Sequence, residues 1–346
     1  MGDTRASDRV FERFQLIVNA PALFNALVSG VDLGLFAFLS RSPNASFEDI
    51  QRAVDIPPHQ LRVLLFAICT TELIEKDGDS YRNSEVAESA LAHDQPGSWQ
   101  GILRGFQRFQ YPAFPHLSSA LRSGKPTALD AYPGSGSSFY ERISHDPEAE
   151  SGYHAFLVAF AQLLTPQLLQ HEGLASVRHL LDVGGGSGET AVLFAERFPE
   201  AKVTVFDLPT VSQLGARTLP ASVQGRISFH PGNLMEDRFP GGVDGILFSH
   251  VVEIFSAERI LSMFERAFEA LVPGGKIFLY NMTAQDDEKG GPLCARASLF
   301  FNVLASGEGM TYPARDYEAW LRQVGFASVE TFRCQYEHAI VVGTKA

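Results

Sequence analysis

A glycine-rich loop is the stretch of this sequence whose residue types and spacing point most directly to chemistry. An apolar run ends at Asp182, and Gly184, Gly186 and Gly188 follow before a helical pattern opens at Glu189. Glycine allows the backbone to approach a ligand closely, and a loop that leaves a parallel strand lies at the sheet edge where open α/β folds bind ligands. Glu189 stands where a dinucleotide fingerprint requires a third small residue. The spacing therefore indicates a cofactor without a pyrophosphate above the helix.

The second chemical feature is an acidic residue at the end of the next apolar run. Asp207 closes the strand in Val-Phe-Asp-Leu-Pro. It lies about 20 residues beyond the loop, where an acid accepts hydrogen bonds from both hydroxyls of a bound ribose. The alternative role for Asp207 is to cap the helix that starts near Pro209. The loop and the acid together predict a cofactor that contains a ribose.

These residues must be positioned by the elements of the second half of the chain. From residue 177 onward, short apolar runs alternate with helical patterns, which predicts a parallel sheet with helices on both faces. The predicted strands are residues 178–183, 202–206, 226–229, 243–248 and 276–281, and the predicted helices are residues 189–197, 210–217 and 257–271. The last two runs, residues 327–333 and 338–343, are joined by too few residues for a parallel crossover, so they should pair antiparallel. The fold class is α/β, with a Rossmann-like domain over residues 173–346.

The first 100 residues have a different pattern, which is mostly helical. Ser46 is the expected N-cap of one helix, residues 59–71 form the next, and a short hairpin follows. This order is typical of a winged helix, which can bind DNA through its second helix. That helix offers few polar side chains, whereas DNA recognition needs several exposed donors. Packing or dimerisation is the favoured role for residues 1–100, and residues 101–172 are expected to form a helical linker.

The composition of the chain excludes several classes of protein. A net charge of −12 over 346 residues is unsuited to nucleic-acid binding, because phosphate neutralisation supplies most of that affinity. Cys69, Cys294 and Cys334 are far apart and odd in number, so neither a disulfide framework nor a metal site is expected, and a cytoplasmic setting is the simplest interpretation. The polar N-terminus does not predict a signal peptide. The longest apolar stretch, residues 155–164, is too short to span a membrane.

Four stretches carry a resemblance to a known family. They are DVGGGSG from residue 182, VFDLP from residue 205, GNLMEDRFP from residue 232 and VPGGKIFLYNM from residue 272. Together they resemble the S-adenosylmethionine-dependent O-methyltransferases of natural-product biosynthesis, including plant caffeate-type and bacterial tailoring enzymes. The resemblance covers nearly the whole chain. It implies S-adenosylmethionine as cofactor, a small-molecule acceptor, a Rossmann-like methyltransferase domain, and a homodimer formed through the N-terminal winged-helix domain.

The resemblance also implies where the cofactor binds. Asp182 and Gly184 would lie by its methionine part, Asp207 would hold the ribose, and Asn233 and Leu234 would flank the adenine. The full set of expected cofactor residues is Asp182, Gly184, Gly186, Asp207, Leu208, Asn233, Leu234 and Ser249. The family usually has Asp where this chain has Asn233, and often Lys where it has Ser249. An Asn amide can still hydrogen-bond an adenine amino group.

The position of the family's catalytic base departs from the usual pattern. Family members usually carry a His-Asp-Trp run after the fourth strand, and Glu253 stands at the His position here. The second family acid is replaced by Gly309, with Glu308 one position away. A carboxylate beside an apolar wall can have a raised pKa and serve as a base, so Glu253 is the candidate catalytic residue. The alternatives for Glu253 are substrate binding, or a structural role ahead of the helix at Ala257.

Further residues are candidates for acceptor binding. His250 lies three residues before Glu253, although a strand-end histidine facing solvent is the simpler interpretation. The family's linker helix lines the substrate pocket, which makes residues of that helix candidates, and core packing explains the apolar ones about as well. The candidate substrate-binding residues are His154, Leu157, Phe160, His250, Phe300 and Met310.

Several functions remain open from the sequence. Methyl transfer to a hydroxyl of an aromatic or polyketide-like molecule is the first hypothesis. Methyl transfer to carbon is the second, because the loss of the histidine and the Tyr336-Glu-His run resemble a bacteriochlorophyll-type carbon methyltransferase. The third is a relative that retains the cofactor but catalyses decarboxylation, hydroxylation or a pericyclic step. A winged-helix regulator with a sensor domain is the last alternative.

Overall fold

The computed structural model describes residues 2–289 and 291–346, with side chains described from residue 7. Its contacts divide the chain into two compact units. The N-terminal unit is Met1–Arg108 with Ala155–Leu163, and the C-terminal unit is Phe109–His154 with Leu164–Ala346. The predicted linker, residues 101–172, is therefore shared between the two units.

The N-terminal unit consists of helices and one small antiparallel sheet. Its helices are α1 (Gly2–Asp32), α2 (Leu35–Arg41), α3 (Phe47–Val54), α4 (Pro58–Cys69), α5 (Glu85–Leu91) and α6 (Gln100–Gly105). Its strands are β1 (Ala45–Ser46), β2 (Ile74–Asp77) and β3 (Ser80–Asn83), in the order β1-β3-β2. The predicted N-cap is confirmed, because the Ser46 side chain accepts from the Asp49 backbone and Asp49 bonds back to Ser46. The helical order and the hairpin follow the prediction.

The longest helix of this unit, α1, exposes a series of apolar side chains. Phe11, Phe14 and Ile17 are 58%, 58% and 73% exposed. By length and composition, Ser7–Asp32 could also cross a membrane, with a mean hydropathy of 1.5 over its best 18 residues. The sequence predicts one or two apolar helices over residues 10–40, but not a stretch long enough to span a membrane, because Gln15, Asn19 and other polar residues interrupt the apolar run. An exposed apolar face of this size marks an interaction surface.

The C-terminal unit contains the remaining helices and all the larger strands. Its helices are α7 (Leu117–Ser123), α8 (Phe139–Ile143), α9 (Pro147–Leu168, in part), α10 (Glu189–Arg197), α11 (Pro209–Thr218), α12 (Ala257–Ala270), α13 (Pro292–Phe300) and α14 (Ala314–Val324). Its strands are β4 (His179–Val183), β5 (Lys202–Asp207), β6 (Ile227–Pro231), β7 (Val243–Ser249), β8 (Leu271–Met282), β9 (Ser328–Arg333) and β10 (His338–Thr344). Short 3-10 or π segments are η1 (Phe106–Gln110), η2 (Tyr111–His116), η3 (Thr127–Ala131), η4 (Glu172–Ser176), η5 (Ala221–Val223), η6 (Val252–Ile254) and η7 (Phe301–Ala305).

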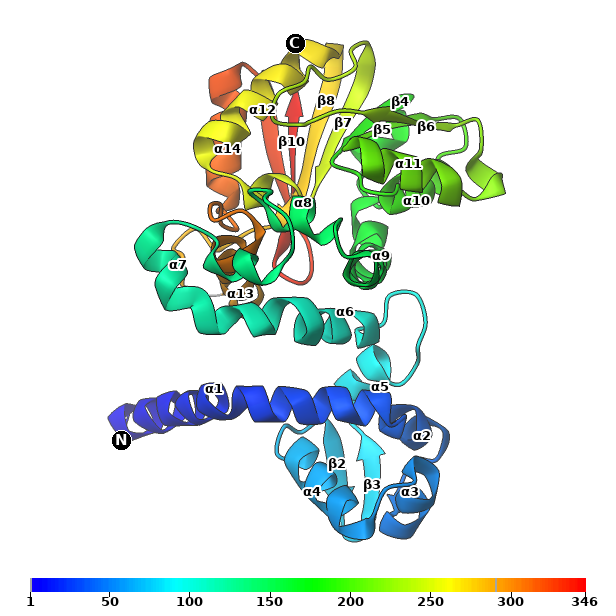
Figure 1. Ribbon diagram of the computed structural model, residues 1–346, viewed down its shortest axis with the longest axis vertical. Helices are drawn as coiled ribbons and strands as arrows, with labels where there is room; N and C mark the ends of the chain where they lie inside the picture. Colours follow the sequence, from blue (N-terminus) through cyan, green and yellow to red (C-terminus); the bar gives the residue numbers. More distant parts are fainter. Residues whose placement is uncertain (1, 290) are drawn as a thin grey trace. The chain divides into compact units, whose positions relative to one another are not determined.

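The seven strands form one twisted sheet, which confirms the predicted α/β class. Their order is β6-β5-β4-β7-β8-β10-β9. The first five run parallel, and β10 is antiparallel to both β8 and β9, as the short connection required. Helices α10 and α11 lie beside β4, β5 and β6, while α12 and α14 lie beside β8, β9 and β10 (Figure 1). The carboxyl ends of β4, β5 and β7 therefore meet at one edge, between these groups of helices.

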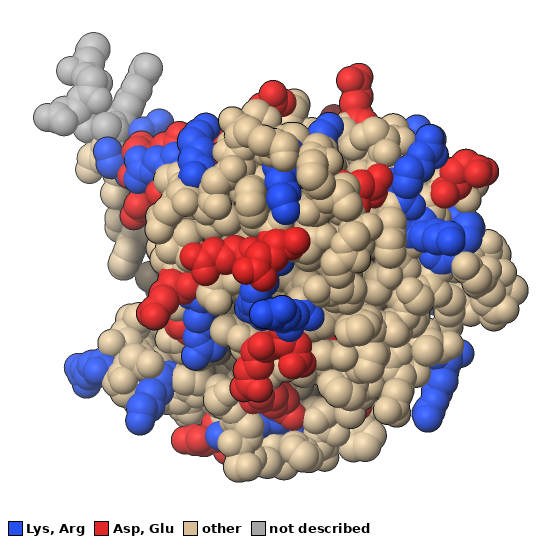
Figure 2. All heavy atoms as spheres, turned by 90° about the horizontal axis from the view of Figure 1, so that it is seen from above, with Lys and Arg blue, Asp and Glu red and all other residues tan. Residues whose placement is uncertain are grey.

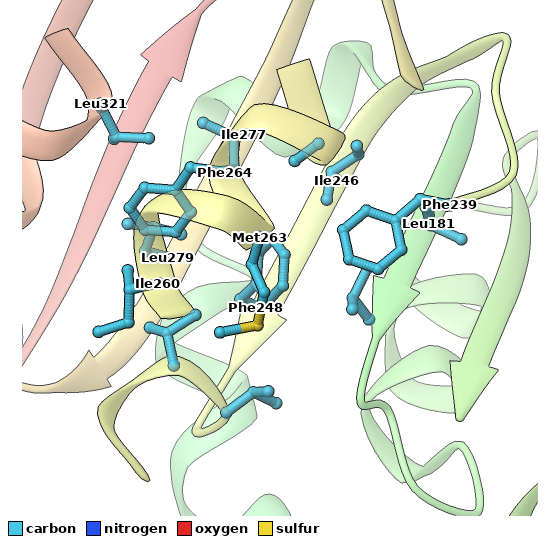
Figure 3. Packing of buried hydrophobic residues seen from close by; sticks show 14 of the residues in the cluster. Leu181, Phe239, Ile246, Phe248, Ile260, Met263, Phe264, Ile277, Leu279 and Leu321 are labelled. Atoms are coloured by element: carbon cyan, nitrogen blue, oxygen red, sulfur yellow. The ribbon is translucent and has the colours of Figure 1, made fainter. Parts of the chain in front are cut away.

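Apolar side chains from both the sheet and α12 hold this unit together. Strand β7 reads as a nearly continuous apolar run because it lies between two neighbouring parallel strands and is covered by helices. Phe248 from β7 and Phe264 from α12 have ring centroids 6.1 Å apart, and Met263 packs beside them (Figure 3). Each fully buried side chain of this size contributes about 1.5–3 kcal/mol to folding. The rigid core fixes the strand ends that carry the candidate site.

Charged side chains of both signs are mixed on the face of the molecule shown in Figure 2. Figure 2 shows acidic and basic groups close to one another on one face of the molecule, so the net charge of −12 is not gathered there in a field of a single sign.

Candidate active site

The glycine loop leaves β4 in a backbone conformation that requires glycine. Gly184, Gly186 and Gly188 have φ values of 70°, 62° and 96°, in the left-handed region. A Cβ added to Gly186 would have no heavy atom within 4 Å, so this part of the loop borders open space. Gly188 is also the N-cap of α10. The loop can therefore bring backbone groups against a ligand at the carboxyl edge of the sheet.

Asp207 ties this loop to the end of β5. One carboxylate oxygen accepts from the Gly186 N–H at 2.8 Å, and the other accepts from the Leu208 N–H at 2.7 Å. The helix that follows has Leu208 as its N-cap and no side-chain cap, so Asp207 does not fill the alternative capping role. Burial raises the pKa of Asp207, and its two backbone hydrogen bonds oppose that effect. Each oxygen keeps acceptor capacity for a ribose hydroxyl.

Asp182 provides a direct test of whether a cofactor fits here. The side chain is fully buried, and neither of its oxygens has a hydrogen-bond partner among the described residues. Burial, together with the nearby Asp207 and Glu189, raises the pKa of Asp182 to about 7. A buried carboxylate without partners is costly unless a cation or donor satisfies it. The ammonium group of a bound methionine moiety would do so, and the residues present therefore fit S-adenosylmethionine.

His154 lies beside the same loop. Its ring nitrogens are 3.1 and 3.2 Å from the Ser187 hydroxyl, and its Nε2 is 3.5 Å from a Glu189 oxygen. The Ser187 hydroxyl is also 2.9 Å from both Glu189 oxygens. The structure thus places this candidate substrate residue against Ser187 and Glu189, which follow Gly184 and Gly186 of the expected cofactor loop.

The remaining expected cofactor residues follow β6 and β7. Asn233 accepts from the Met235 N–H at 2.9 Å through its side-chain oxygen, while its own backbone N–H donates to Asp237 at 2.8 Å. Leu234 packs against the core of the C-terminal unit. These two hydrogen bonds fix the turn that contains Asn233. They also fix the orientation of the Asn233 side-chain amide.

Ser249, at the end of β7, belongs to a partly buried chain of hydrogen bonds. Its hydroxyl lies 3.2 Å from His250 Nδ1, and His250 Nε2 lies 2.9 Å from His338 Nε2. His338 Nδ1 in turn lies 2.6 Å from the Tyr336 carbonyl oxygen. Burial lowers the pKa of His250 well below its usual value and that of His338 to about 4. The expectation of a solvent-facing His250 is wrong, because β10 brings His338 against it.

Glu253 lies in η6, directly after the end of β7, and is 1% exposed. The backbone N–H groups of Glu253 and Met282 point at its carboxylate, but Oε2 has no partner among the described residues. Burial raises the pKa of Glu253 well above its usual value. The alternative structural role, at the start of the helix near Ala257, is not supported because Ser256 is the N-cap of that helix.

The position of the family's second acid has no room for a side chain. Gly309 has a φ of 85°, and a Cβ there would come within 2.5 Å of the Glu253 carbonyl oxygen. The neighbouring Glu308 forms an ion pair with Arg259 at 3.1 Å. The candidate pocket residue Met310 follows, half-buried. Neither Gly309 nor Glu308 replaces the missing acid.

An aromatic cluster lies next to Glu253, and most of it was not predicted. We define it as Phe109, Tyr132, Phe139, Tyr140, Tyr153 and Phe300. The Phe139 ring is 4.9 Å from the Tyr153 ring and 6.5 Å from the Phe300 ring, which was a predicted pocket residue. Burial, helped by the charge of Glu253, raises the pKa of Tyr140 to about 12. The sequence signal for this cluster is the series of aromatic residues between positions 132 and 153.

Two predicted pocket residues belong to the other unit. Phe160 packs on Phe156, with ring centroids 5.8 Å apart, and Leu157 is 40% exposed. Both lie in the part of α9 that is assigned to the N-terminal unit, whereas His154, His250, Phe300 and Met310 lie in the C-terminal unit.

Comparisons with known proteins show the family to which the chain belongs. The family model described as an O-methyltransferase domain matches residues 114–327. L-tyrosine C(3)-methyltransferase of Streptomyces lavendulae is 25% identical over 95% of this chain and 91% of its own length. 3-hydroxy-5-methyl-1-naphthoate 3-O-methyltransferase of Streptomyces sahachiroi is 29% identical over 92% and 91%. The crystal structure of the S-adenosylmethionine-dependent methyltransferase SibL superposes with a TM-score of 0.85 at 27% identity, covering 96% of this chain and 98% of that one.

These matches confirm the expected cofactor and enzyme class. The family model covers residues 114–327, and the relatives and the solved structure align with nearly the full length of the chain. With the fit of Asp182 and the glycine loop to S-adenosylmethionine, they lead to one conclusion. The chain belongs to the O-methyltransferase domain family and is an S-adenosylmethionine-dependent methyltransferase.

Proposed function

We propose that the chain methylates a hydroxyl group of an aromatic or polyketide-like small molecule, with Glu253 in the place of the usual histidine. The observation that carries the proposal is the buried Glu253 carboxyl, whose Oε2 has no partner among the described residues and whose neighbourhood includes Tyr140. The relative from Streptomyces sahachiroi is named for methylation of a naphthoate hydroxyl, which supports this choice of acceptor.

In this mechanism the protein positions the acceptor and removes its proton. When bound, S-adenosylmethionine supplies a methyl group activated by its sulfonium. Asp182, Asp207 and the glycine loop hold the cofactor, and the aromatic cluster holds the acceptor ring. Alignment of the two reactants provides a large part of the rate enhancement. The ionised Glu253 accepts the hydroxyl proton, and its raised pKa brings its basicity closer to that of a phenol.

Methylation of a ring carbon is the second candidate function. The relative from Streptomyces lavendulae is named as a C(3)-methyltransferase of L-tyrosine. On this route Glu253 would ionise a phenol, the adjacent ring carbon would take the methyl group, and that carbon would then lose its proton. A reaction without methyl transfer, such as decarboxylation or hydroxylation, remains the third hypothesis.

We further propose that the N-terminal unit is a winged-helix domain that forms a homodimer in the cytoplasm. Its order of helices and hairpin, and the exposed apolar residues of α1 and α4, support this role. Val63 and Phe66 on α4 are 55% and 73% exposed, in addition to the face of α1. The three cysteines are free thiols.

One experiment tests the three reactions. Purified protein is incubated with S-adenosylmethionine and a panel of phenols, naphthols and anthraquinones, and S-adenosylhomocysteine release is measured. The products are then examined by nuclear magnetic resonance. A methoxy signal supports the proposal, and a new aryl methyl signal supports carbon methylation. Consumption of acceptor without release of S-adenosylhomocysteine would refute both.

A further inference from the structure

The segment that follows β7 has a strained backbone beside the glycine loop. The register of the parallel strands β4 and β7 puts Ser249 at the level of Gly184. A Cβ added to Gly184 would come within 2.7 Å of the Val251 side chain, so the segment also packs on the loop. His250 has a φ of 56°, a left-handed conformation that residues other than glycine rarely adopt. Strain of this kind persists only where surrounding contacts enforce it, and it is concentrated at functional sites.

The contact that holds His250 comes from a strand that is not a neighbour of β7. Strand β8 lies between β7 and β10 and pairs with both (Figure 1). The Tyr280 ring of β8 is 5.3 Å from the His250 ring and 5.4 Å from the His338 ring, and the two histidine Nε2 atoms are 2.9 Å apart. Pairing with β8 already fixes the register of β7 and β10. The contact between the histidines therefore fixes the segment after β7 rather than the sheet.

The turn between β9 and β10 holds His338 in one orientation. Tyr336 and Glu337 in this turn have φ values of 53° and 58°, and the Tyr336 carbonyl oxygen lies 2.6 Å from His338 Nδ1. The Glu337 carboxylate accepts from the Cys294 N–H at 2.8 Å, which ties the turn to the start of α13. His338 itself is 1% exposed. The imidazole therefore meets His250 in a fixed position.

The same hydrogen bonds decide whether the Ser249 hydroxyl oxygen donates or accepts at the sheet edge. A carbonyl oxygen can only accept, so His338 carries its proton on Nδ1, and its Nε2 accepts from His250 Nε2. His250 Nδ1 is then an acceptor, and the Ser249 hydroxyl donates to it at 3.2 Å. Burial lowers the pKa of both histidines, which keeps the rings neutral at pH 7. The hydroxyl proton of Ser249 is thus used within the protein, and its oxygen remains an acceptor for a ligand.

We propose that His338 is a positioning residue for the cofactor, and that it acts through His250 on Ser249. The half-buried Ser249 oxygen accepts from a donor group of S-adenosylmethionine, which offers amino groups and ribose hydroxyls. An oxygen whose lone pairs face the ligand favours these donors over the carboxylate of the cofactor. His250 is then assigned to the cofactor rather than to the acceptor. The inference goes beyond the proposed function, because it holds whichever atom of the acceptor takes the methyl group.

A double-mutant cycle tests whether His338 acts through Ser249, with binding of S-adenosylhomocysteine measured by calorimetry. We expect Ser249→Ala and His338→Leu each to weaken binding about three- to tenfold, the range for one hydrogen bond. The double variant should bind no more weakly than Ser249→Ala alone. His338→Gln should stay within about twofold of the unaltered protein, because its amide oxygen can accept from His250 in place of Nε2. Losses that multiply in the double variant, or unchanged affinity in His338→Leu, would overturn the proposal.

Two control variants distinguish this hydrogen-bond chain from general damage to the fold. Glu337→Gln alters the same turn but leaves His338 and its partners in place, so its affinity should stay within about twofold. His179→Leu removes another ring of the sheet, hydrogen-bonded to Thr204 at 2.9 Å at the opposite end of β4, and should also retain affinity. A loss in Glu337→Gln equal to that in His338→Leu would assign the effect to the turn as a whole and overturn the proposal.

Nuclear magnetic resonance of the unaltered protein gives a readout that does not depend on the folding of any variant. The imidazole nitrogen signals report which nitrogen carries the proton, and we expect protonated Nε2 in His250 and protonated Nδ1 in His338. Addition of S-adenosylhomocysteine should shift the His250 Nδ1 signal, because Ser249 then accepts from the ligand, and should leave the His179 signals in place. The opposite proton positions, or a His250 Nδ1 signal that does not respond at saturation, would overturn the proposal.

Discussion

His250 and His338 are 88 residues apart in the chain, yet their Nε2 atoms lie 2.9 Å from each other. The Tyr336 carbonyl oxygen can accept only if His338 carries its proton on Nδ1. His338 Nε2 then accepts from His250 Nε2, and His250 Nδ1 accepts from the Ser249 hydroxyl. The proton positions on both imidazole rings are thus assigned from their hydrogen-bond partners. The chain leaves Ser249 with a fixed hydroxyl direction at the edge of the sheet.

The first prediction concerns acid stability. His338 is 1% exposed and its folded-state pKa is about 4, below the ordinary 6.5. The unfolded state therefore binds more protons between pH 6.5 and 4, so the contribution of His338 is present above pH 6.5 and is lost as the pH falls toward 4. Its size is up to about 3 kcal/mol. Urea unfolding measures the free energy of unfolding at pH 7 and pH 4.5. The decrease in this free energy between the two pH values should be smaller in His338→Phe than in the unaltered protein.

Exposed His116 supplies the control, as His116→Phe should lose stability on acidification like the unaltered protein. Comparing variants is necessary because Asp182, Asp207 and Glu253, whose pKa values are raised, act in the opposite direction. An identical loss in His338→Phe and the unaltered protein would contradict the prediction.

The second prediction concerns the cofactor. Asp207→Ala should weaken binding of S-adenosylhomocysteine by about 1.5–3 kcal/mol, the range for hydrogen bonds to a charged group. It also removes the acceptor that holds the Gly186 and Leu208 N–H groups. Calorimetry measures the change, with the exposed Asp94→Ala as control. Unchanged affinity would remove Asp207 from the site.

The third prediction tests the proposed base. Glu253→Gln should retain cofactor affinity but lower kcat by about 10²–10⁴-fold, because Gln keeps the size and loses the basicity. Because the pKa of Glu253 is well above its usual value, kcat of the unaltered enzyme should rise with pH through that raised pKa. The variant should lack this rise. A tenfold or smaller drop in kcat would be enough to abandon the base.

The fourth prediction concerns the packing of Gly309 on the backbone of η6. Gly309→Ala should destabilise the protein by about 2 kcal/mol or more, from a left-handed φ combined with a steric clash. Gly225 has a φ of 82° with no atom near its added Cβ, so Gly225→Ala carries the backbone strain alone. The difference between the two free energies of unfolding isolates the clash with Glu253. Equal destabilisation in the two variants would show that the loop at Gly309 moves to relieve the clash at no cost in free energy.

The fifth prediction is the homodimer. Ile17 is 73% exposed on the apolar face of α1, and Ile17→Glu should shift the protein from dimer to monomer at micromolar concentration. Light scattering measures the mass. Leu214→Glu, at a 38% exposed position on α11, should remain dimeric. A monomer in the unaltered protein would refute the interface.

Local sequence patterns were sufficient to predict the sheet and the glycine loop. Continuous apolar runs identify buried parallel strands because both faces of such a sheet are covered. Gly184, Gly186 and Gly188 stand out in the sequence because the loop needs positive φ values that favour glycine at these three positions. Long-range partners were not accessible in the same way. Nothing local to Ser249 or His250 indicates that His338 is their neighbour, and Arg296 and Gln110 meet only because α13 folds back. Helical structure over residues 10–40 follows from the apolar pattern, but the start of α1 at Gly2 does not, because the first residues are polar.

The contact between Gly309 and the backbone at Glu253 also constrains how this chain can change by mutation. A return to the family's usual pair requires a histidine at 253 and an acid at 309, and each position is reached by a separate substitution. An acid at 309 meets the η6 backbone whatever residue stands at 253, so that first step lowers stability before it can gain a function. Because the clash is with backbone atoms, a change of side chain at 253 does not relieve it, and every path to the family's usual pair carries this loss of stability.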